Sequence, residues 1–519
     1  MTDKVSILWA DDEIDLLKPH LIFLKEKGYE VVTTTNGNDA LVKFAQNSFD
    51  IVFLDENMPG LSGLETLNRI KNLKSEIPVV MITKSEEETI MEDAIGSKIS
   101  DYLIKPVNPN QILLSIKKNL ENKRLVSEKT SAAYQQEFRS LGMMLNERLN
   151  HSSWTELYKK IVYWELELNS AKDSGLYEVL VQQKSEANNQ FCRFVESNYL
   201  RWLKEPDKDA PVMSHTLFKK KIQPVLTTSK KPVFVILIDN LRYDQWKVIQ
   251  PLIIERFRMK SEETYYSILP TATQFARNAF FAGLMPKFIE ERFPGKWEPD
   301  DSDVGKNLHE EAFLADQLKR LRFEEKFSYS KIITHKDSTE LAERILNLLT
   351  NRLNVIVVNF VDMLSHAKSE MDMIRELADD EAAYRSLTLS WFTHSPLLEA
   401  LDKLSEKEVD IIITTDHGTI RVEEPSKVMA ERATNTNLRY KHGRALTIIP
   451  KDVFLVNNPA DAMLPKQYVN DKFAFAKQDK FFVYPNNYNQ FVNHYRSTLQ
   501  HGGVSLEEMI VPFVHLENK

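Results

Sequence analysis

Short apolar runs alternate with longer amphipathic stretches over roughly the first 120 residues. The runs are rich in β-branched residues and read as strands: Val5–Trp9, Val31–Thr33, Ile51–Leu54, Val79–Ile82 and Tyr102–Ile104. Between them, apolar residues recur at helical spacing. Strands that alternate with helices in this way predict a flavodoxin-like, doubly wound parallel sheet over residues 1–120.

The pattern changes to long helical stretches from about Gln111 onward. One predicted helix face shows the three-and-four spacing of an amphipathic helix, through Trp154, Leu157, Tyr158, Ile161, Val162, Glu165 and Leu168. Pro206, Pro211 and Pro224 then interrupt the helices. We therefore expect a central helical bundle over residues 121–206.

Apolar strands return after residue 207, and each ends in residues that carry chemistry. The runs are Val233–Ile238, Val355–Phe360 and Asp410–Thr415. In open parallel sheets, the carboxyl ends of the strands meet at one edge, where ligands bind. Residues 207–519 are accordingly expected to form a second α/β domain with a site at that edge.

Composition narrows the class of protein. With 519 residues the chain exceeds what one hydrophobic core usually holds, which fits three domains. Its net charge of −8 disfavours duplex DNA as a main partner, because duplex affinity depends on Lys and Arg. The single cysteine, Cys192, excludes an internal disulfide framework. Without an apolar leader or a membrane-length apolar run, a cytoplasmic protein with no membrane span is expected.

Three carboxylates are predicted to meet at the strand ends of the first domain: Asp11, Asp12 and Asp55. Like charges this close raise one another's pKa or demand a cation, and Mg²⁺ is the hard ion that oxygen ligands suit. Asp55 could then attack a phosphoryl group as a carboxylate nucleophile. Lys105 would neutralise the phosphate oxygens and Thr83 would hydrogen-bond one of them. Pro106 suggests a constrained, cis-compatible peptide that aims the lysine.

These residues stand in motifs that resemble the receiver domain of two-component response regulators: Trp9-Ala10-Asp11-Asp12-Glu13, Leu54-Asp55-Glu56-Asn57-Met58-Pro59-Gly60, Ile82-Thr83-Lys84 and Ile104-Lys105-Pro106. The resemblance implies phosphorylation of Asp55 by a sensor histidine kinase and formation of a homodimer when phosphorylated. It also implies a Mg²⁺ site at Asp11, Asp12, Asp55 and Asn57, and a switch made of Thr83, Tyr102 and Lys105.

A second set of candidate metal ligands lies in the C-terminal half. Asp362 and His366 are four apart after a strand, so both could face one ion from a single helical turn. Asp239 closes another strand, while Asp416-His417-Gly418 and His501-Gly502-Gly503 place histidines beside flexible glycines. Any one of these motifs is more often a capped turn than a ligand set, and only their joint occurrence carries weight.

Their order along the chain, with Pro270-Thr271-Ala272-Thr273 in between, resembles the alkaline phosphatase superfamily, particularly its nucleotide phosphodiesterase and PglZ branches. The resemblance implies one metal at Asp362, His366 and His501 and another at Asp239, Asp416 and His417. A threonine would be the nucleophile; Thr273 fits the pattern better, and Thr271 stays open. Mixed histidine and aspartate ligands suit Zn²⁺ best and Mn²⁺ next. A sulfatase does not fit, since Cys192 lies far from any metal motif.

Cationic residues near this site offer contacts to a nucleotide. The candidates are Arg277 and three residues of the segment 439–444, namely Lys441, His442 and Arg444. A solvated basic loop explains the segment equally well. A cyclic or short oligonucleotide would suit a narrow rim better than a rigid duplex.

The whole arrangement resembles response regulators of the PorX type, in which a receiver is fused to a PglZ domain. That resemblance implies a metal-dependent phosphodiesterase that regulates type IX secretion, with an extracytoplasmic-function sigma factor and secretion components as partners. An alternative of a different class is a non-catalytic metal-binding scaffold that recruits the same partners. A scaffold would have no need of a threonine between two metals.

Overall fold

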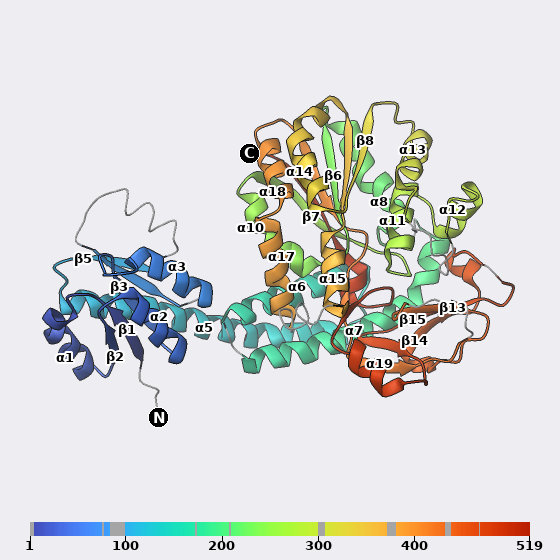
Figure 1. Ribbon diagram of the computed structural model, residues 1–519. Coiled ribbons are helices and arrows are strands. Elements are labelled where there is room, and N and C mark those ends of the chain that lie inside the picture. Colours follow the sequence, from blue (N-terminus) through green and yellow to red (C-terminus); the bar gives the residue numbers. More distant parts are fainter. Residues whose placement is uncertain are drawn as a thin grey trace. The chain divides into compact units, whose positions relative to one another are not determined.

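The computed structural model describes residues 5–74, 77–83, 99–171, 174–206, 209–298, 307–370, 380–430, 437–466 and 468–519. Side chains are described over the same residues except 121–129, 171, 174 and 366–370. The chain forms two compact units: a first unit of Met1–Gln135 with Ala171–Asp173, and a second unit of Gln136–Ser170 with Ser174–Lys519 (Figure 1). No helix in the described residues is long and apolar enough to cross a membrane.

The first unit is built on a five-stranded parallel sheet in the order β2-β1-β3-β4-β5. The strands are β1 (Ser6–Ala10), β2 (Glu30–Thr34), β3 (Ile51–Asp55), β4 (Val79–Thr83) and β5 (Asp101–Ile104). The helices are the 3₁₀ turn η1 (Ile14–Leu17), α1 (Lys18–Glu26), α2 (Gly37–Gln46), α3 (Gly63–Leu73) and the start of α5 (Pro109–Asn146). The predicted doubly wound parallel sheet is confirmed, with every predicted run inside or overlapping a strand.

Local sequence explains where two of these helices begin. The Asn36 side chain accepts a hydrogen bond from the backbone N–H of Asp39, which caps α2. Ser62 and Glu65 form a reciprocal capping box at the start of α3. Both devices satisfy backbone N–H groups that the first turn of a helix leaves without partners. The caps therefore fix the residue at which each helix begins, while the parallel pairing of the strands places their ends at one edge of the sheet.

Three long helices occupy the predicted helical region: α5, α6 (His151–Ala171) and α7 (Ser174–Lys204). The predicted apolar face of α6 is buried throughout, from Trp154 to Leu168. Trp154 packs on Phe191 of α7 with ring centroids 5.6 Å apart, so α6 and α7 lie against each other. From Gln136 onward, the described residues of this region share one compact unit with the C-terminal domain.

A six-stranded mixed sheet forms the centre of the second unit, in the order β7-β18-β10-β6-β9-β8 (Figure 1). The strands are β6 (Val233–Ile238), β7 (Phe257–Tyr266), β8 (Phe327–Ile332), β9 (Leu353–Val358), β10 (Asp410–Thr414) and β18 (Ile510–Asn518). β10, β6, β9 and β8 run parallel, whereas β18 pairs antiparallel with both β10 and β7. The carboxyl ends of the parallel strands therefore meet at one edge, as expected, and the antiparallel pair completes the sheet.

Helices surround this sheet, and the strands of three small sheets lie between β10 and β18 in the sequence. The helices are α8 (Ser214–Leu217), the π-helical η2 (Phe218–Ile222), α9 (Gln223–Thr228), α10 (Tyr243–Ile254), α11 (Thr273–Ala282), α12 (Pro286–Arg292), α13 (Glu310–Arg320), α14 (His335–Arg344), η3 (Ile345–Thr350), α15 (Phe360–Glu370), α17 (Glu381–Thr393), α18 (Pro396–Ser405), the 3₁₀ turns η4 (Pro450–Asp452) and η5 (Pro459–Ala462), α19 (Tyr488–Tyr495) and α20 (Leu506–Met509). The short strands are β11 (Ile420–Arg421), β12 (Glu424–Lys427), β13 (Tyr440–Gly443), β14 (Val453–Val456), β15 (Lys472–Ala476), β16 (Lys480–Val483) and β17 (Leu499–Gln500). Apolar side chains of β6, β9, α11 and α13 pack into one buried core beneath the edge that carries the site.

Candidate metal centre and active site

The first unit gathers three carboxylates at the carboxyl edge of its sheet. Asp11 follows β1 and Asp55 ends β3, and oxygens of Asp11, Asp12 and Asp55 lie within 4.8 Å of one another. The Lys105 Nζ lies 3.0 Å from Asp11 Oδ2 and 2.8 Å from Asp55 Oδ1. Asp11 and Asp55 are buried and Asp12 is exposed, so the cluster opens to solvent on one side.

Burial and charge act on this cluster together. Burial raises the pKa of Asp55, and the negative charge of Asp11 adds to the effect. Burial acts to lower the pKa of Lys105, but its hydrogen bonds to Asp55 and Asp11 raise it overall. The lysine therefore stays charged and offsets part of the repulsion between the acids.

The other predicted residues of this site differ in their contacts and in their exposure to solvent. The Thr83 hydroxyl donates a hydrogen bond to Glu56 Oε2 at 2.6 Å. Tyr102 is 42 % exposed, and Asn57 is exposed in the turn after β3. The Lys105–Pro106 peptide is cis, as the sequence suggested. The carboxylate that Thr83 contacts, Glu56, was not predicted from the sequence as part of this site.

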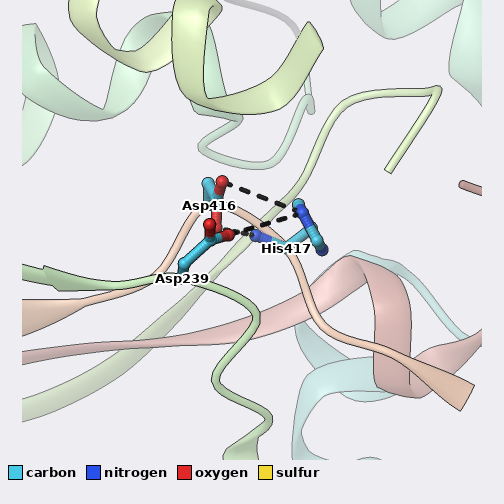
Figure 2. A group of neighbouring side chains, drawn as sticks. All are labelled: Asp239, Asp416 and His417. Carbon is cyan, nitrogen blue, oxygen red and sulfur yellow. Dashed lines mark hydrogen bonds and ion pairs between the residues drawn. The ribbon is translucent and has the colours of Figure 1, made fainter. Parts of the chain in front are cut away.

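The second unit gathers Asp239, Asp416 and His417 at the carboxyl ends of the neighbouring strands β6 and β10 (Figure 2). Ligand-type atoms of these three residues all lie within 4.8 Å of one another. His417 Nε2 is 3.8 Å from Asp239 Oδ1 and 3.8 Å from Asp416 Oδ2. All three side chains are almost completely buried.

Two oxygens in this group are buried without a hydrogen-bond partner among the described residues: Asp239 Oδ1 and Asp416 Oδ2. Buried polar atoms nearly always have a hydrogen-bond partner, and an ion that binds there is one of the standard explanations when they do not. The His417 Nδ1 lies 3.0 Å from the backbone oxygen of Gly418, a contact that only an Nδ1–H can satisfy, so Nε2 faces the two carboxylates as an acceptor. Two carboxylate oxygens and an imidazole nitrogen are a donor set that suits a divalent ion such as Zn²⁺.

The charge state of the group follows from burial. Burial and the charge of Asp239 raise the pKa of Asp416 well above its usual value. Burial also lowers the pKa of His417, which favours the neutral imidazole. Neutral imidazole is the form that binds metal.

Thr273 and Thr271 are clearly distinguished by their contacts. Thr273 begins α11, and its Oγ1 lies 3.0 Å from His417 Nε2. The Thr271 hydroxyl is fully buried and is engaged elsewhere: it donates to the backbone oxygen of Gly503 at 2.8 Å and accepts from the Gly502 N–H at 3.1 Å. The Thr273 hydroxyl therefore faces the group formed by Asp239, Asp416 and His417. The Thr271 hydroxyl instead hydrogen-bonds the loop that follows His501.

A second half of the site adjoins the first. His501 Nε2 is 3.7 Å from Asp362 Oδ1, and the rings of His417 and His501 stack with centroids 4.4 Å apart. The structure thus brings Asp362 and His501 together next to the Asp239 group. His366 lies in the helix α15, and its side chain falls outside the described residues.

Asn240 links the two halves, and the sequence reasoning missed it. Its backbone N–H lies 3.3 Å from Asp416 Oδ1, and its Nδ2 donates to Asp362 Oδ1 at 3.2 Å. The same Nδ2 lies 3.1 Å from Ser365 Oγ. Asn240 has φ of 62°, a left-handed conformation that Asn tolerates better than most residues. An Asn directly after an Asp at a strand end was the signal available in the sequence.

Arg277 faces carboxylates rather than open space. It is 2 % exposed, and its Nη1 lies 2.7 Å from Asp239 Oδ2. Its Nε lies 2.5 Å from Glu310 Oε1 and 4.0 Å from Asp416 Oδ2. Although burial acts to lower the pKa of Arg277, these carboxylates raise it. The described contacts of Arg277 offset the charge of the site's acids, and its predicted contact with a substrate stays a prediction.

The predicted basic segment is largely a strand, β13. Lys441 is buried with its Nζ 5.0 Å from the ring centroid of Tyr484, and His442 stacks on Phe473 at 5.1 Å. Arg444 is exposed and lies over Tyr468 at 4.5 Å. A solvated loop is therefore wrong for Lys441 and His442, which pack on aromatic rings inside the second unit.

Models of three known families match successive parts of the chain. Residues 7–117 match the response regulator receiver domain, and residues 124–203 match the PorX response regulator linker domain. Residues 217–516, more than half of the chain, match the alkaline phosphatase-like PglZ domain of BREX systems. The match covers Asp239, Thr273, Asp416 and His501.

Two curated relatives match about a quarter of this chain. The transcriptional regulatory protein ResD of Bacillus subtilis is 29 % identical over 22 % of this chain and 48 % of its own length. ZraR of Klebsiella oxytoca is 34 % identical over 24 % of this chain and 28 % of its own length. The chain thus spans about half or less of these relatives. Among solved structures, the chemotaxis protein CheY4 of Vibrio cholerae is 26 % identical, covering 22 % of this chain and 98 % of that one with a TM-score of 0.22.

Proposed function

This chain belongs to the family of PglZ alkaline phosphatase-like domains, joined to a response regulator receiver and a PorX linker as in PorX-type regulators, and from this we propose that it is a phosphorylation-regulated, metal-dependent phosphodiesterase. Family membership makes the second unit a phosphatase-like domain. The activity on diesters, the metals and the regulation are the proposal.

The observation that carries the proposal is the position of Thr273. Its hydroxyl is 3.0 Å from His417 Nε2, beside the two buried oxygens of Asp239 and Asp416 that have no hydrogen-bond partner among the described residues. A site that served only to hold metals for folding would gain nothing from a hydroxyl in this place. The arrangement supports a nucleophile held beside a metal-binding group.

In the proposed reaction, the Thr273 Oγ1 forms a bond to phosphorus while the P–O bond to the leaving alcohol breaks. The threonine proton leaves with the alcohol. Water then attacks phosphorus as the P–O bond to Thr273 breaks, which releases a phosphate monoester and returns a proton to the Thr273 hydroxyl. Asp239, Asp416 and His417 would hold one divalent cation, and Asp362, His501 and His366 another. Bound there, two such ions supply Lewis acidity toward the phosphoryl oxygens. The positive charge of Arg277 offsets the negative charges of Asp239 and Glu310.

In the first unit we propose that Asp55 is the phosphorylated residue and that a sensor histidine kinase supplies the phosphoryl group. The contacts of Lys105 with Asp11 and Asp55 support this role, since the lysine lies where phosphoryl oxygens would arrive. Asp11 and Asp12, with Asn57, would hold Mg²⁺ beside Asp55. Thr83 and Tyr102 would respond to the phosphoryl group and favour a homodimer.

The proposed substrates are cyclic or short linear oligonucleotides. Arg444 is exposed and lies 4.5 Å from the ring centroid of Tyr468, which is exposed too, a combination that suits phosphate and base contacts. Lys441 and His442 are buried against rings of their own domain and would add positive charge rather than open contacts. A role in type IX secretion, with a sigma factor or secretion components as partners, follows from the PorX-type arrangement alone.

Turnover of a generic phosphodiester by the full chain with added Zn²⁺ tests the proposal. Thr273→Ala should lower kcat by at least about 10³-fold, because the nucleophile is removed. Thr273→Ser, which keeps a hydroxyl, should retain much of the activity. Thr271→Ser should be near wild type, since a serine hydroxyl can still contact Gly502 and Gly503.

Two results would count against the enzyme. Equal and negligible turnover by the wild type and all three variants would favour the metal-binding scaffold. Full activity in Thr273→Ala would show that hydrolysis does not use this hydroxyl.

A further inference from the structure

The short helix α20 lies against both loops that carry the site's histidines. The backbone N–H of Gly418, the residue after His417, donates to the backbone oxygen of Glu508 at 3.1 Å. The backbone N–H of Gly503, two residues after His501, donates to Glu508 Oε1 at 2.8 Å. One residue of α20 thus hydrogen-bonds both histidine loops.

These contacts leave almost no room between the loops and their surroundings. A Cβ on Gly418 would lie 2.0 Å from the backbone oxygen of Glu507, closer than real Cβ atoms approach. A Cβ on Gly503 would lie 2.4 Å from the backbone oxygen of Ala476 and 2.7 Å from Arg439 Nη2. Because close-packed groups transmit displacement, a shift of α20 would move the backbone next to both histidines.

α20 is in turn held by α7, a helix of the linker region. The Leu506 N–H donates to Asn188 Oδ1 at 2.8 Å, and Asn188 Nδ2 donates to Glu507 Oε2 at 3.0 Å. Lys184 Nζ lies 3.0 Å from Glu507 Oε1. Just before α20, the Cys192 thiol lies 3.1 Å from the backbone oxygen of Val504. Three successive turns of α7 therefore contact the segment 504–507.

Charge makes this attachment specific. Lys184 lies between two acids, 3.0 Å from Glu507 on α20 and 3.0 Å from Glu165 on α6. Burial acts to lower the pKa of Lys184, but Glu165 and Glu507 raise it well above its usual value. Arg385 shares Glu165 at 2.9 Å. Removal of one member would leave a neighbour buried and unpaired, which is costly.

We propose that α7 is a positioning element of the metal site: Asn188 and Lys184 fix α20, and α20 fixes the loops that aim His417 and His501. The linker region is then part of the catalytic unit rather than a spacer. A change that moves α7 would alter the affinity of the site for metal. This inference rests on the proposed metal site and adds to it a route by which the linker acts on that site.

The experiment measures the dissociation constant of Zn²⁺ for the full chain by competition with a chelator. Asn188→Asp removes the N–H donor to Glu507 and places a second carboxylate beside it. It should weaken Zn²⁺ binding about tenfold, which is the lower end of the effect of removing a residue that supports metal ligands. Lys184→Met should weaken it at least as much. Glu507→Gln added to Lys184→Met should restore most of the affinity, because the unpaired carboxylate is gone.

Lys160→Met is the matched control. Lys160 lies on α6 and pairs with Glu137 at 2.7 Å, away from α20, so its loss should leave Zn²⁺ binding unchanged. Melting temperatures in the presence of a chelator show how far each variant is destabilised without metal.

The outcomes separate the two proposals. A Zn²⁺ affinity equal to wild type in Asn188→Asp and Lys184→Met, with lower melting temperatures alone, would reduce α7 to a structural support and overturn the inference. Absence of Zn²⁺ binding in the wild type would overturn the proposed function as well. A loss of affinity confined to the α7 variants, with rescue by Glu507→Gln, is the result expected.

Discussion

The two acidic sites of this chain solve the same electrostatic problem in different ways. In the first unit, Lys105 lies between Asp11 and Asp55 and contacts both acids directly. In the second unit, Arg277 binds the far oxygen of Asp239 and leaves Asp239 Oδ1 and Asp416 Oδ2 without a hydrogen-bond partner in the described part of the chain. The first arrangement suits a carboxylate that itself accepts a phosphoryl group and keeps it. The second leaves oxygens facing a histidine and a hydroxyl, which suits metal binding and repeated turnover.

The comparison predicts that the first site alone governs the response to phosphorylation. Asp55→Ala should abolish dimerisation induced by beryllofluoride and Mg²⁺, because the acceptor carboxylate is missing. Multi-angle light scattering of the full chain measures the change in mass. Asp15→Ala, at an exposed acid in the same unit, is the control and should dimerise normally. A dimer of undiminished population in Asp55→Ala would contradict the assignment.

The buried Arg277 should contribute far more to the stability of the second unit than an exposed arginine of the same unit does. Arg277→Met leaves the buried Asp239 and Asp416 without this counter-charge, whereas Glu310 keeps Lys331 at 3.0 Å, and the change should lower the free energy of unfolding of the metal-free protein by about 3–5 kcal/mol. Arg292→Met removes an arginine that pairs with Asp316 at 2.7 Å but is 45 % exposed, and should cost under about 1 kcal/mol. Denaturant unfolding followed by tryptophan fluorescence reports mainly the second unit, since Trp9 is the sole tryptophan before residue 136. Similar losses in the two variants would refute the role given to Arg277.

Acid should weaken the second unit through a group outside its site. Burial lowers the pKa of His215 to about 4, with a smaller contribution from the charge of Lys220. An unfolded histidine titrates near its ordinary value, so the unfolded state binds more protons between about pH 6.5 and pH 4. The stabilisation is present above pH 6.5 and is lost as pH falls through this window, by about 3 kcal/mol. His215→Leu should flatten the dependence of unfolding free energy on pH there, and an unchanged slope would exclude His215 as its source.

The smallest expected effect on metal binding comes from Asn240, which contacts both halves of the second site. Asn240→Gly keeps the left-handed backbone and the N–H toward Asp416 but loses the amide that holds Asp362. It should weaken Zn²⁺ binding about tenfold, or about 1.4 kcal/mol. Asn240→Ala loses the same amide and adds a backbone strain of about 1 kcal/mol, which should appear as lower stability. Competition titration measures the loss of Zn²⁺ affinity, and thermal unfolding measures the loss of stability. Equal Zn²⁺ affinity in wild type and Asn240→Gly would show that Asn240 does not support the metal site.

Much of this architecture is predictable from sequence because local signals and sheet geometry act together. Apolar β-branched runs located β6 and β10, and the convergence of parallel strand ends placed Asp239 near Asp416 and His417. The antiparallel insertion of β18 between β10 and β7 has no local signature, since pairing partners lie far apart in sequence.

Contacts between distant segments account for what the sequence reasoning missed. The ion pairs of Arg277 with Asp239 and Glu310 could not be foreseen, because both partners lie outside its own helix. The segment 439–444 appeared equally compatible with a solvated loop because the aromatic rings that cover it come from other segments. Spacing alone also left Thr271 and Thr273 open, and only their hydrogen bonds to distant residues distinguish them.

Anomalous scattering from crystals grown with Zn²⁺, measured at the zinc edge, would locate any ions bound in the second unit. Two peaks are expected, one within ligand distance of Asp239, Asp416 and His417 and one beside Asp362 and His501, with the Thr273 hydroxyl next to them. No peak at Asp239, Asp416 and His417, or peaks only at distant surface residues, would contradict the proposed metal site.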